Sequence, residues 1–212
     1  MNIGIFGGSF NPIHTGHLIV ASYFAQWTDL DAVWLMLSPL NPFKADAQAP
    51  TAADSRLEML QLAVDTVPRL DICTVQLSMP TPSYTIDALD TLHRLDPHDT
   101  FRCIIGSDSW ADFDKWRDSD RIITDYGVMI YPRPGYPVEP ATLPPGVTLI
   151  DAPRVDISST FNRQAVAAGK DIRYFVPQQV AQYIASHNLY ANTLTTDQTC
   201  HRLHSATTRW HS

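Results

Sequence analysis

The sequence predicts an α/β fold in which a mostly parallel β-sheet is flanked by helices. Short apolar segments alternate along the chain with segments whose apolar residues recur at helical spacing. A glycine-rich stretch with two histidines directly follows the first apolar segment, where parallel sheets of this class bind ligands. This alternation is typical of right-handed βαβ units, so one continuous sheet is expected.

The strands are predicted from apolar runs of strand length. Residues 1–6 are expected to form a buried strand that leads directly into a turn at Gly7 and Gly8. The other strands are expected at residues 32–38, 72–77, 101–105, 127–131 and 147–150.

The helices are predicted where apolar residues recur every three or four positions. Ser55 and Glu58 have the spacing of a capping box, so a helix is expected to begin there. The proline-rich segments 39–53 and 132–145 are expected to be loops. The other helices are expected at 16–27, 83–95, 159–168 and 178–186, the last two forming a small C-terminal helical part.

Length and composition bound the domain organisation and the partners. A chain of 212 residues with 44% hydrophobic content predicts a single domain over residues 1–190. Residues 191–212 are polar and aperiodic, and are expected to be a disordered tail. The formal net charge of −7 disfavours a nucleic acid polymer as partner, whereas a small nucleotide needs only one or two local cations.

Cysteine usage and hydropathy predict a soluble, cytoplasmic protein without membrane contact. Cys73, Cys103 and Cys200 are far apart and lack metal-ligand spacing, which is typical of reduced thiols. The first residues do not resemble a signal peptide, and no apolar run is long enough to span a bilayer. The sequence is compatible with a homo-oligomer.

The stretch from Gly4 to His17 has the composition of a phosphate site. Glycines let the backbone approach an anion closely, and a helix start offers unpaired N–H groups with a favourable dipole. His14 and His17 lie three residues apart, so both imidazoles face the same side of a helical turn. Either histidine alone would indicate a structural role, but together, after a first strand, they predict a nucleotide phosphate site.

A second helix start of this kind lies at residues 157–163, with the sequence Ile-Ser-Ser-Thr-Phe-Asn-Arg. Its hydroxyls and N–H groups can hold phosphate oxygens, and the guanidinium of Arg163 adds a fork of donors. Alone, it would indicate only a helix cap with a solvated arginine. The two stretches in this order resemble the signatures of the nucleotidyltransferase family that carries the HxGH motif.

Along residues 1–190 the chain resembles the bacterial nicotinate-nucleotide adenylyltransferases. The resemblance implies a Rossmann-like nucleotidyltransferase fold and an enzyme that transfers the adenylyl group of ATP to nicotinate mononucleotide. The products would be deamido-NAD, in NAD biosynthesis, and pyrophosphate. The matching pieces are residues 82–85, 104–108, 115–116, 133–136, 176–177, 183–184 and 189–190.

The resemblance and the two helix starts assign an expected set of site residues. The catalytic groups are expected to be His14, His17 and Arg163. The expected ATP-binding residues are Gly7, Gly8, Ser9, Phe10, His14, His17, Gly106, Ser158, Ser159, Thr160 and Arg163.

The resemblance also implies the residues that bind the mononucleotide. Trp116 would stack on the pyridine ring, the backbone near Thr85 would read its carboxylate, and Asp108 would hold a ribose. Lys44 and Arg133 would meet the mononucleotide phosphate. Trp116 could equally be a core residue, and Arg133 could merely face solvent. Phe43 stands where many relatives have histidine, which leaves it a packing contact.

The expected chemistry needs alignment and electrostatic stabilisation more than covalent work by the protein. Oxygen of the mononucleotide phosphate would attack the α-phosphorus of ATP in line with the departing pyrophosphate. His14 and His17 would donate hydrogen bonds to ATP phosphate oxygens, either as neutral rings or as imidazolium ions. Mg²⁺ is expected to arrive on ATP, because no cluster of acidic residues and histidines suggests a metal site built by the protein.

Several alternatives stay open at this stage. The acceptor could be nicotinamide mononucleotide, since the discriminating contact would come from the backbone. Phosphopantetheine adenylyltransferases have threonine at the position of His14, and cytidylyltransferases have arginine ahead of the Ser-Thr run, so both fit less well. A nucleotide sensor without activity would not need both histidines and Arg163.

Overall fold

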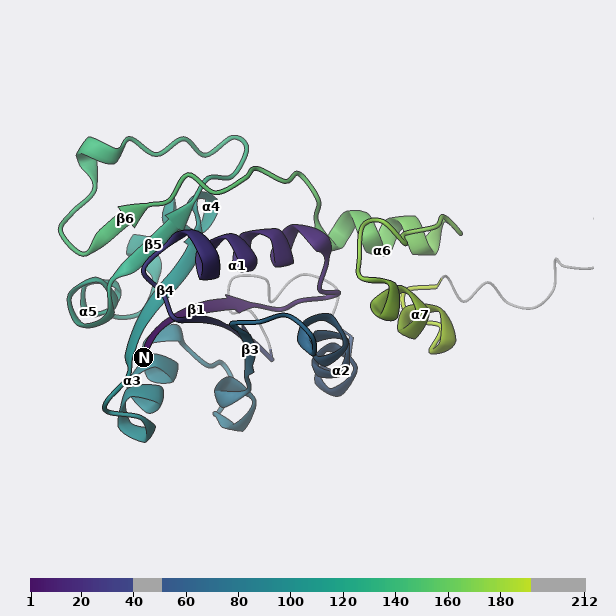
Figure 1. Ribbon diagram of the computed structural model, residues 1–212, viewed down its shortest axis with the longest axis horizontal. Helices are drawn as coiled ribbons and strands as arrows, with labels where there is room; N and C mark the ends of the chain where they lie inside the picture. The colour runs from purple at the N-terminus through teal and green to yellow at the C-terminus, as the bar shows by residue number, and fades with distance from the viewer. Residues whose placement is uncertain (40–50, 192–212) are drawn as a thin grey trace, which may run out of the picture.

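Six parallel strands in the order β3-β2-β1-β4-β5-β6 form the sheet of the computed structural model, which describes residues 1–39 and 51–191 (Figure 1). The order reverses between β1 and β4, so the switch point lies at the carboxyl ends of these two strands. This confirms the predicted α/β class with a parallel sheet. The strands are β1 (Asn2–Gly8), β2 (Ala32–Leu37), β3 (Leu70–Cys73), β4 (Thr100–Gly106), β5 (Val128–Tyr131) and β6 (Val147–Leu149).

Helices cover both faces of the sheet and bury its apolar side chains. On one face Phe24 and Leu60 belong to a buried cluster, and on the other Ile86 and Leu89 do so. Figure 1 shows α1 and α3 on opposite sides of β1, with α6 and α7 at the end toward which β1 runs. The helices are α1 (Thr15–Trp27), α2 (Ala53–Val64), α3 (Thr85–Leu95), α6 (Ser159–Ala167) and α7 (Gln178–Ser186).

The predicted Gly-Gly turn is wrong, because Gly7 and Gly8 are the last residues of β1. They pair with Met36 and Leu37 of β2, and the carbonyl of Gly8 accepts a hydrogen bond of 2.9 Å from the backbone N–H of Ser38. The chain turns two residues after Gly8, at Phe10, whose φ is +42°. The strand is therefore longer than its apolar run.

The third strand also ends elsewhere than residues 72–77 predict. β3 pairs Cys73 with Met36, the last β2 residue in this register. The following residues find no strand partner there, and they close a short 3₁₀ turn, η2 (Val75–Ser78). Apolar side chains at Val75 and Leu77 mark burial here rather than strand structure.

Helix α2 begins at Ala53, so the capping box expected at Ser55 is wrong. The N-cap residue is Ala52, which caps without a side-chain hydrogen bond. Arg56 is 1% exposed, and its Nε donates to the carbonyl of Thr51 at 2.8 Å, which fixes the turn that precedes the helix.

Residues 107–126 fold into short helical pieces that the sequence did not predict. They are α4 (Ser107–Trp110), η3 (Phe113–Lys115), α5 (Ser119–Arg121) and the π-helical turn η4 (Ile122–Tyr126). Only Phe113 and Ile122 anchor the last three pieces in the core. Two buried apolar residues are too few to form the apolar stripe from which a helix is predicted, so the sequence did not reveal these pieces.

Parts of the predictions fall outside the described residues. These are most of the 39–53 loop, including Phe43 and Lys44, and nearly all of the 191–212 tail. Within residues 1–39 and 51–191, no helix is both long and apolar enough to cross a membrane.

Arg56 gives a test of how strongly the loops depend on buried donors. We expect Arg56→Leu to lower the free energy of unfolding by about 3 kcal/mol or more, because it leaves several carbonyl groups without donors. Urea unfolding measures this. Arg173→Leu, which removes an exposed arginine paired with Asp171, is the matched control and should cost about 0.5 kcal/mol or less. Equal stability of the two variants would contradict the prediction.

Candidate active site

The loop between β1 and α1, residues 9–14, is held through its backbone carbonyl groups. Nη1 of Arg56 donates to the carbonyl of Ser9 at 2.7 Å, and Nη1 of Arg163 donates to that of Asn11 at 2.8 Å. The hydroxyl of Ser159 donates to the carbonyl of Pro12 at 2.9 Å. Donors from α2 and α6 thus fix three of the four residues that precede Ile13.

His14 and His17 stack on each other at the start of α1. Their ring centroids are 3.6 Å apart at an interplanar angle of 26°. The backbone N–H of His14 donates to Nδ1 of His17 at 3.3 Å. Nδ1 of His17 is therefore an acceptor, and in the neutral ring the proton sits on Nε2. This geometry confirms that both imidazoles share one side of the turn.

His14 is the more buried of the two histidines. Desolvation by burial, reinforced by the charge of Arg133, lowers the pKa of His14 to about 4. The ring is therefore neutral at pH 7 in this structure, so of the two expected protonation states it has the uncharged one. Its Nδ1 atom is buried without a hydrogen-bond partner among the described residues.

The second predicted helix start, at α6, packs directly against this loop. Ser158 caps the helix, its hydroxyl oxygen accepting from the N–H of Phe161 at 3.1 Å. Nη2 of Arg163 donates to the hydroxyl of Thr160 at 3.2 Å, while Nη1 reaches the loop. The structure thus brings the two sequence motifs together, although Ser158 and Ser159 use their hydroxyls within the protein.

Gly8 and Gly16 of the first motif leave room for the aromatic rings beside them. A Cβ atom on Gly8 would lie 2.9 Å from the ring of Phe10, and one on Gly16 would lie 3.1 Å from the ring of His14. Gly7 differs, because its Cβ would make only an ordinary contact of 3.6 Å with Met36. Phe10 itself is buried and packs on His17 at 5.1 Å between ring centroids, so its side chain belongs to the core.

Asp108 and Arg133 meet at the carboxyl end of β4. Nε of Arg133 lies 3.8 Å from Oδ1 of Asp108, and the backbone N–H of Arg133 donates to the hydroxyl of Ser107 at 2.8 Å. Both side chains cross over Gly106, where a Cβ atom would overlap with Asp108. The charge of Arg133 also lowers the pKa of His14, so this cluster lies close enough to the histidines to act on them.

Trp116 lies at the edge of a buried cluster, half-buried and 5.2 Å from the ring of Phe113. The next residue, Arg117, lies 4.8 Å over the ring of Tyr84 and pairs with Asp87 at 3.2 Å. These contacts bring the Trp116 segment beside the start of α3, where Thr85 is the first helical residue. Lys44, the remaining predicted site residue, lies outside the described residues.

The sequence prediction missed three residues that shape the loop. Arg56 carries a detectable signal, because it falls on the same helical stripe as Met59, Leu60 and Ala63, where a charged residue is unusual. Asn11 and Tyr190 carry no such signal. Their hydrogen bond, from the Tyr190 hydroxyl to Oδ1 of Asn11 at 2.8 Å, joins residues 179 positions apart.

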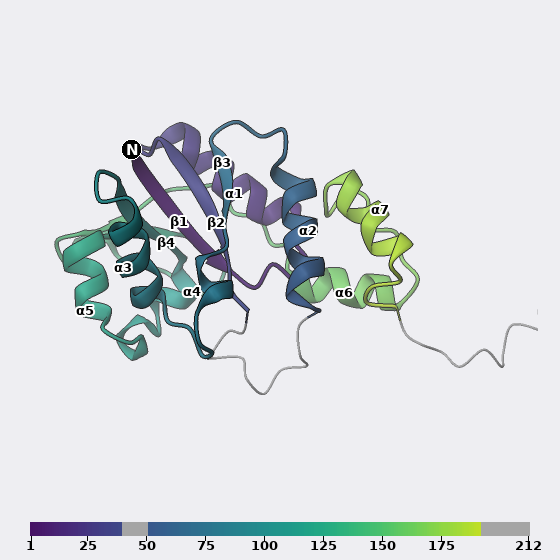
Figure 2. The same ribbon diagram turned by 90° about the horizontal axis from the view of Figure 1, so that it is seen from below.

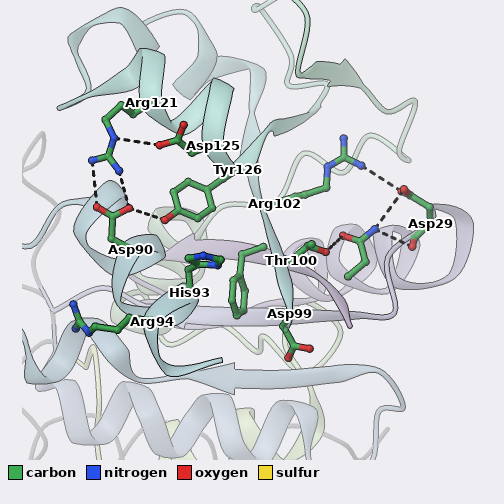
Figure 3. Close-up of a pocket in the computed structure, with 12 residues that line it drawn as sticks. Asp29, Asp90, His93, Arg94, Asp99, Thr100, Arg102, Arg121, Asp125 and Tyr126 are labelled. Carbon is green, nitrogen blue, oxygen red and sulfur yellow. Dashed lines mark hydrogen bonds and ion pairs between the residues drawn. The ribbon is translucent and has the colours of Figure 1, made fainter. Parts of the chain in front are cut away.

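A separate cavity of about 890 Å³ lies at the opposite end of the sheet, beside the first residues of β1 and β4 (Figure 3). Its charged groups largely pair with one another. Arg121 contacts Asp90 at 3.0 Å and Asp125 at 3.2 Å, and the hydroxyl of Tyr126 donates to Asp90 at 2.6 Å. Because it lies at the opposite end of the sheet, the cavity is remote from both sequence motifs.

Comparisons with known proteins agree with this geometry. A family model described as cytidylyltransferase-like matches residues 5–165, which include both motifs. A probable nicotinate-nucleotide adenylyltransferase of Bacteroides fragilis is 43% identical over 198 residues, covering 93% of this chain and 96% of the relative. The chain belongs to the nicotinate-nucleotide adenylyltransferase family.

Further members of the family show the same extent of similarity. The probable nicotinate-nucleotide adenylyltransferase of Thermus thermophilus is 41% identical, covering 90% of this chain and 100% of the relative. The fold also matches a Plasmodium falciparum nicotinic acid mononucleotide adenylyltransferase complexed with NaAD. That match has a TM-score of 0.74 at 22% identity and covers 89% of this chain and 97% of the other.

The lowered pKa of His14 predicts a specific dependence of stability on pH. Below pH 6.5 the unfolded chain binds a proton on His14 that the folded chain does not bind until about pH 4. The wild type should therefore lose about 2 kcal/mol of unfolding free energy between pH 7 and pH 5 that His14→Asn does not lose. Urea unfolding of both proteins over this range measures the difference, since the other titrating groups cancel. Parallel curves would contradict it.

Proposed function

We propose that this chain transfers the adenylyl group of ATP to nicotinate mononucleotide, giving deamido-NAD and pyrophosphate. The main support is the meeting of the two motifs, in which Ser159 and Arg163 bond to the loop that leads into His14. One continuous surface can therefore bind a triphosphate from two helix starts. The relatives whose names carry this activity cover nearly the whole chain.

The reaction joins two phosphates and needs no nucleophile from the protein. An oxygen of the mononucleotide phosphate forms a bond to the α-phosphorus of ATP. The bond from that phosphorus to the oxygen of the departing pyrophosphate breaks on the opposite side. The protein has to align the two groups and stabilise the charge that builds on the phosphate oxygens.

We assign the two histidines to the phosphates as neutral donors. Nδ1 of His17 is engaged by the backbone, which leaves Nε2–H as the donor of the neutral ring. His14 is neutral because it is buried beside Arg133, and a phosphate close to it would raise its pKa. Arg163, anchored on Asn11, supplies a fixed positive charge toward the β- and γ-phosphates.

We place the mononucleotide across the carboxyl ends of β4 and β5. Arg133 offers its guanidinium to the phosphate, and Asp108 beside it can accept from ribose hydroxyls. The half-buried indole of Trp116 can stack on the pyridine ring. At the start of α3 the cap lacks a side-chain hydrogen bond, and the buried hydroxyl of Ser83 has no partner among the described residues, which suits a carboxylate near Thr85.

Mg²⁺ enters this scheme as part of the nucleotide substrate. The groups at the loop are imidazoles, hydroxyls and guanidiniums, which suit phosphate oxygens better than a hard cation. Mg²⁺ bound to the triphosphate would keep several waters and reduce the charge of the phosphates. We expect the enzyme to work in the cytoplasm, where the free, buried thiols of Cys73 and Cys103 remain reduced.

A pyrophosphate-release assay with three acceptors tests the proposed function. We expect turnover with ATP and nicotinate mononucleotide, at least tenfold lower kcat/KM with nicotinamide mononucleotide, and none with phosphopantetheine. His17→Ala serves as the inactive control and should lose about two orders of magnitude in kcat, the typical contribution of one positioned donor. Preference for either of the other acceptors would refute the assignment.

Trp116 provides a separate test of where the mononucleotide binds. Trp116→Ala should raise the KM for nicotinate mononucleotide about fivefold and leave the KM for ATP within twofold, because stacking on one ring is worth about 1 kcal/mol. Steady-state kinetics with each substrate varied in turn measures the split. Trp110→Ala, which removes a second partly buried indole packed on Phe113, is the control for lost packing. Equal effects on both KM values would make Trp116 a core residue.

A further inference from the structure

The last described turn of the chain is built to bring one side chain onto the catalytic loop. Helix α7 ends with paired bonds from the N–H of Leu189 to the carbonyl of Ile184 at 3.0 Å and from Asn188 to Ala185 at 3.3 Å. This is the pattern of a Schellman cap, with Asn188 in the left-handed region at φ +50°. The cap turns the chain back toward the sheet (Figure 2).

Tyr190 completes that reversal. Its own φ is +61°, a second left-handed conformation at a residue that has a Cβ atom, which carries an energetic cost. The ring packs against the core cluster on the α1 side of the sheet, and the hydroxyl reaches Oδ1 of Asn11 at 2.8 Å. Such a conformation persists only where the contacts it makes offset its cost.

Asn11 is the point of the loop where two anchors meet. Tyr190 holds its side-chain oxygen, and Arg163 holds its backbone carbonyl at 2.8 Å. Asn11 is 8% exposed and follows Phe10, whose φ is +42°, so the loop turns sharply just before it. Three residues later the chain reaches His14, and a rotation at Asn11 would move that imidazole.

The surroundings keep the Tyr190 hydroxyl in its donor form. Burial raises the pKa of Tyr190 above its ordinary value, although a hydrogen bond with the side chain of Thr51 and the charges of Arg163 and Arg56 act in the opposite direction. The hydroxyl is thus protonated throughout the neutral range and donates to the amide oxygen.

We propose that Tyr190 is a positioning residue for the triphosphate site, because its hydroxyl fixes Asn11 and thereby the loop that presents His14 and His17. The inference rests on the proposed function in one respect, namely that this loop binds the triphosphate. It assigns a role in substrate binding to the C-terminal turn, which neither motif reaches in sequence.

Two variants of the full chain, each lacking one tyrosine hydroxyl, test the proposal. Tyr190→Phe keeps the ring and loses both the bond to Asn11 and the hydrogen bond with the side chain of Thr51. Tyr183→Phe is the matched control, because its hydroxyl lies on α7 and contacts Glu58 at 3.2 Å instead of the loop. Isothermal titration with α,β-methylene-ATP, a non-hydrolysable analogue, measures binding without any acceptor present.

We expect Tyr190→Phe to bind the analogue about five- to tenfold more weakly than the wild type, and Tyr183→Phe to match the wild type, since one neutral hydrogen bond accounts for at most about tenfold. In turnover, kcat should fall and the KM for ATP should rise, while the KM for the mononucleotide stays within twofold. Thermal denaturation should show both variants folded with similar midpoints.

A double-mutant cycle separates positioning through Asn11 from general packing. In an Asn11→Ala background, Tyr190→Phe should have a clearly smaller effect on analogue affinity, because the Asn11 acceptor is already gone and only the hydrogen bond with Thr51 is left to lose. Analogue affinity within twofold of the wild type for Tyr190→Phe, or an undiminished effect in the Asn11→Ala background, would overturn the proposal. A wild type that binds the analogue but releases no pyrophosphate would refute the proposed reaction alone, and the affinity comparison would still decide the role of Tyr190.

Discussion

A loop that offers its backbone N–H groups to phosphate turns its carbonyl groups toward the protein, and each buried carbonyl then needs a donor. Arg56 meets this need from the core. Besides Ser9 and Thr51, its guanidinium binds the carbonyls of Ser38 and Pro39 at 2.7 and 3.1 Å, so it joins the ends of β1 and β2 to the start of α2. A lysine could not serve, because a single ammonium lacks the planar fork of donors. The shape of the phosphate site that we propose therefore depends on a buried side chain of α2.

Three arginines place positive charge around this loop in an acidic chain. The formal net charge is −7, yet Arg56, Arg133 and Arg163 all act on the loop or its histidines. At the opposite end of the sheet, Arg121 is largely neutralised by Asp90 and Asp125 (Figure 3). Arg56 and Arg163 instead donate to neutral carbonyls, so their charge remains to act on a phosphate. Burial beside one of these charges also explains why His14 is a neutral ring.

The sequence was sufficient to predict the features that depend on local patterns of residues. The parallel sheet and the pairing of His14 with His17 follow from apolar runs and spacing, and so does the start of α6. The turn at Gly7 and the end of β3 were wrong because pairing with β2, a distant segment, decides where both strands end. The cap at Ser55 was wrong because the helix begins two residues earlier, at Ala53. Hydrogen bonds between distant segments, such as that of Tyr190 with Asn11, leave no periodic trace.

Hydrogen bonds between distant segments also explain why the C-terminal helices belong to the candidate site. A doubly wound sheet opens its switch point to solvent at the carboxyl ends of β1 and β4, and α1 covers only one side of it. The first backbone N–H of α1, at Thr15, already bonds to the carbonyl of Phe175 at 2.9 Å, and α6 supplies Ser159 and Arg163 to the same loop. The C-terminal segment thus determines which of the groups at this helix start stay accessible to a nucleotide. The phosphate site that we propose at the start of α1 is in this way shaped by the start of α6, and the two motifs meet only because the chain returns to its beginning.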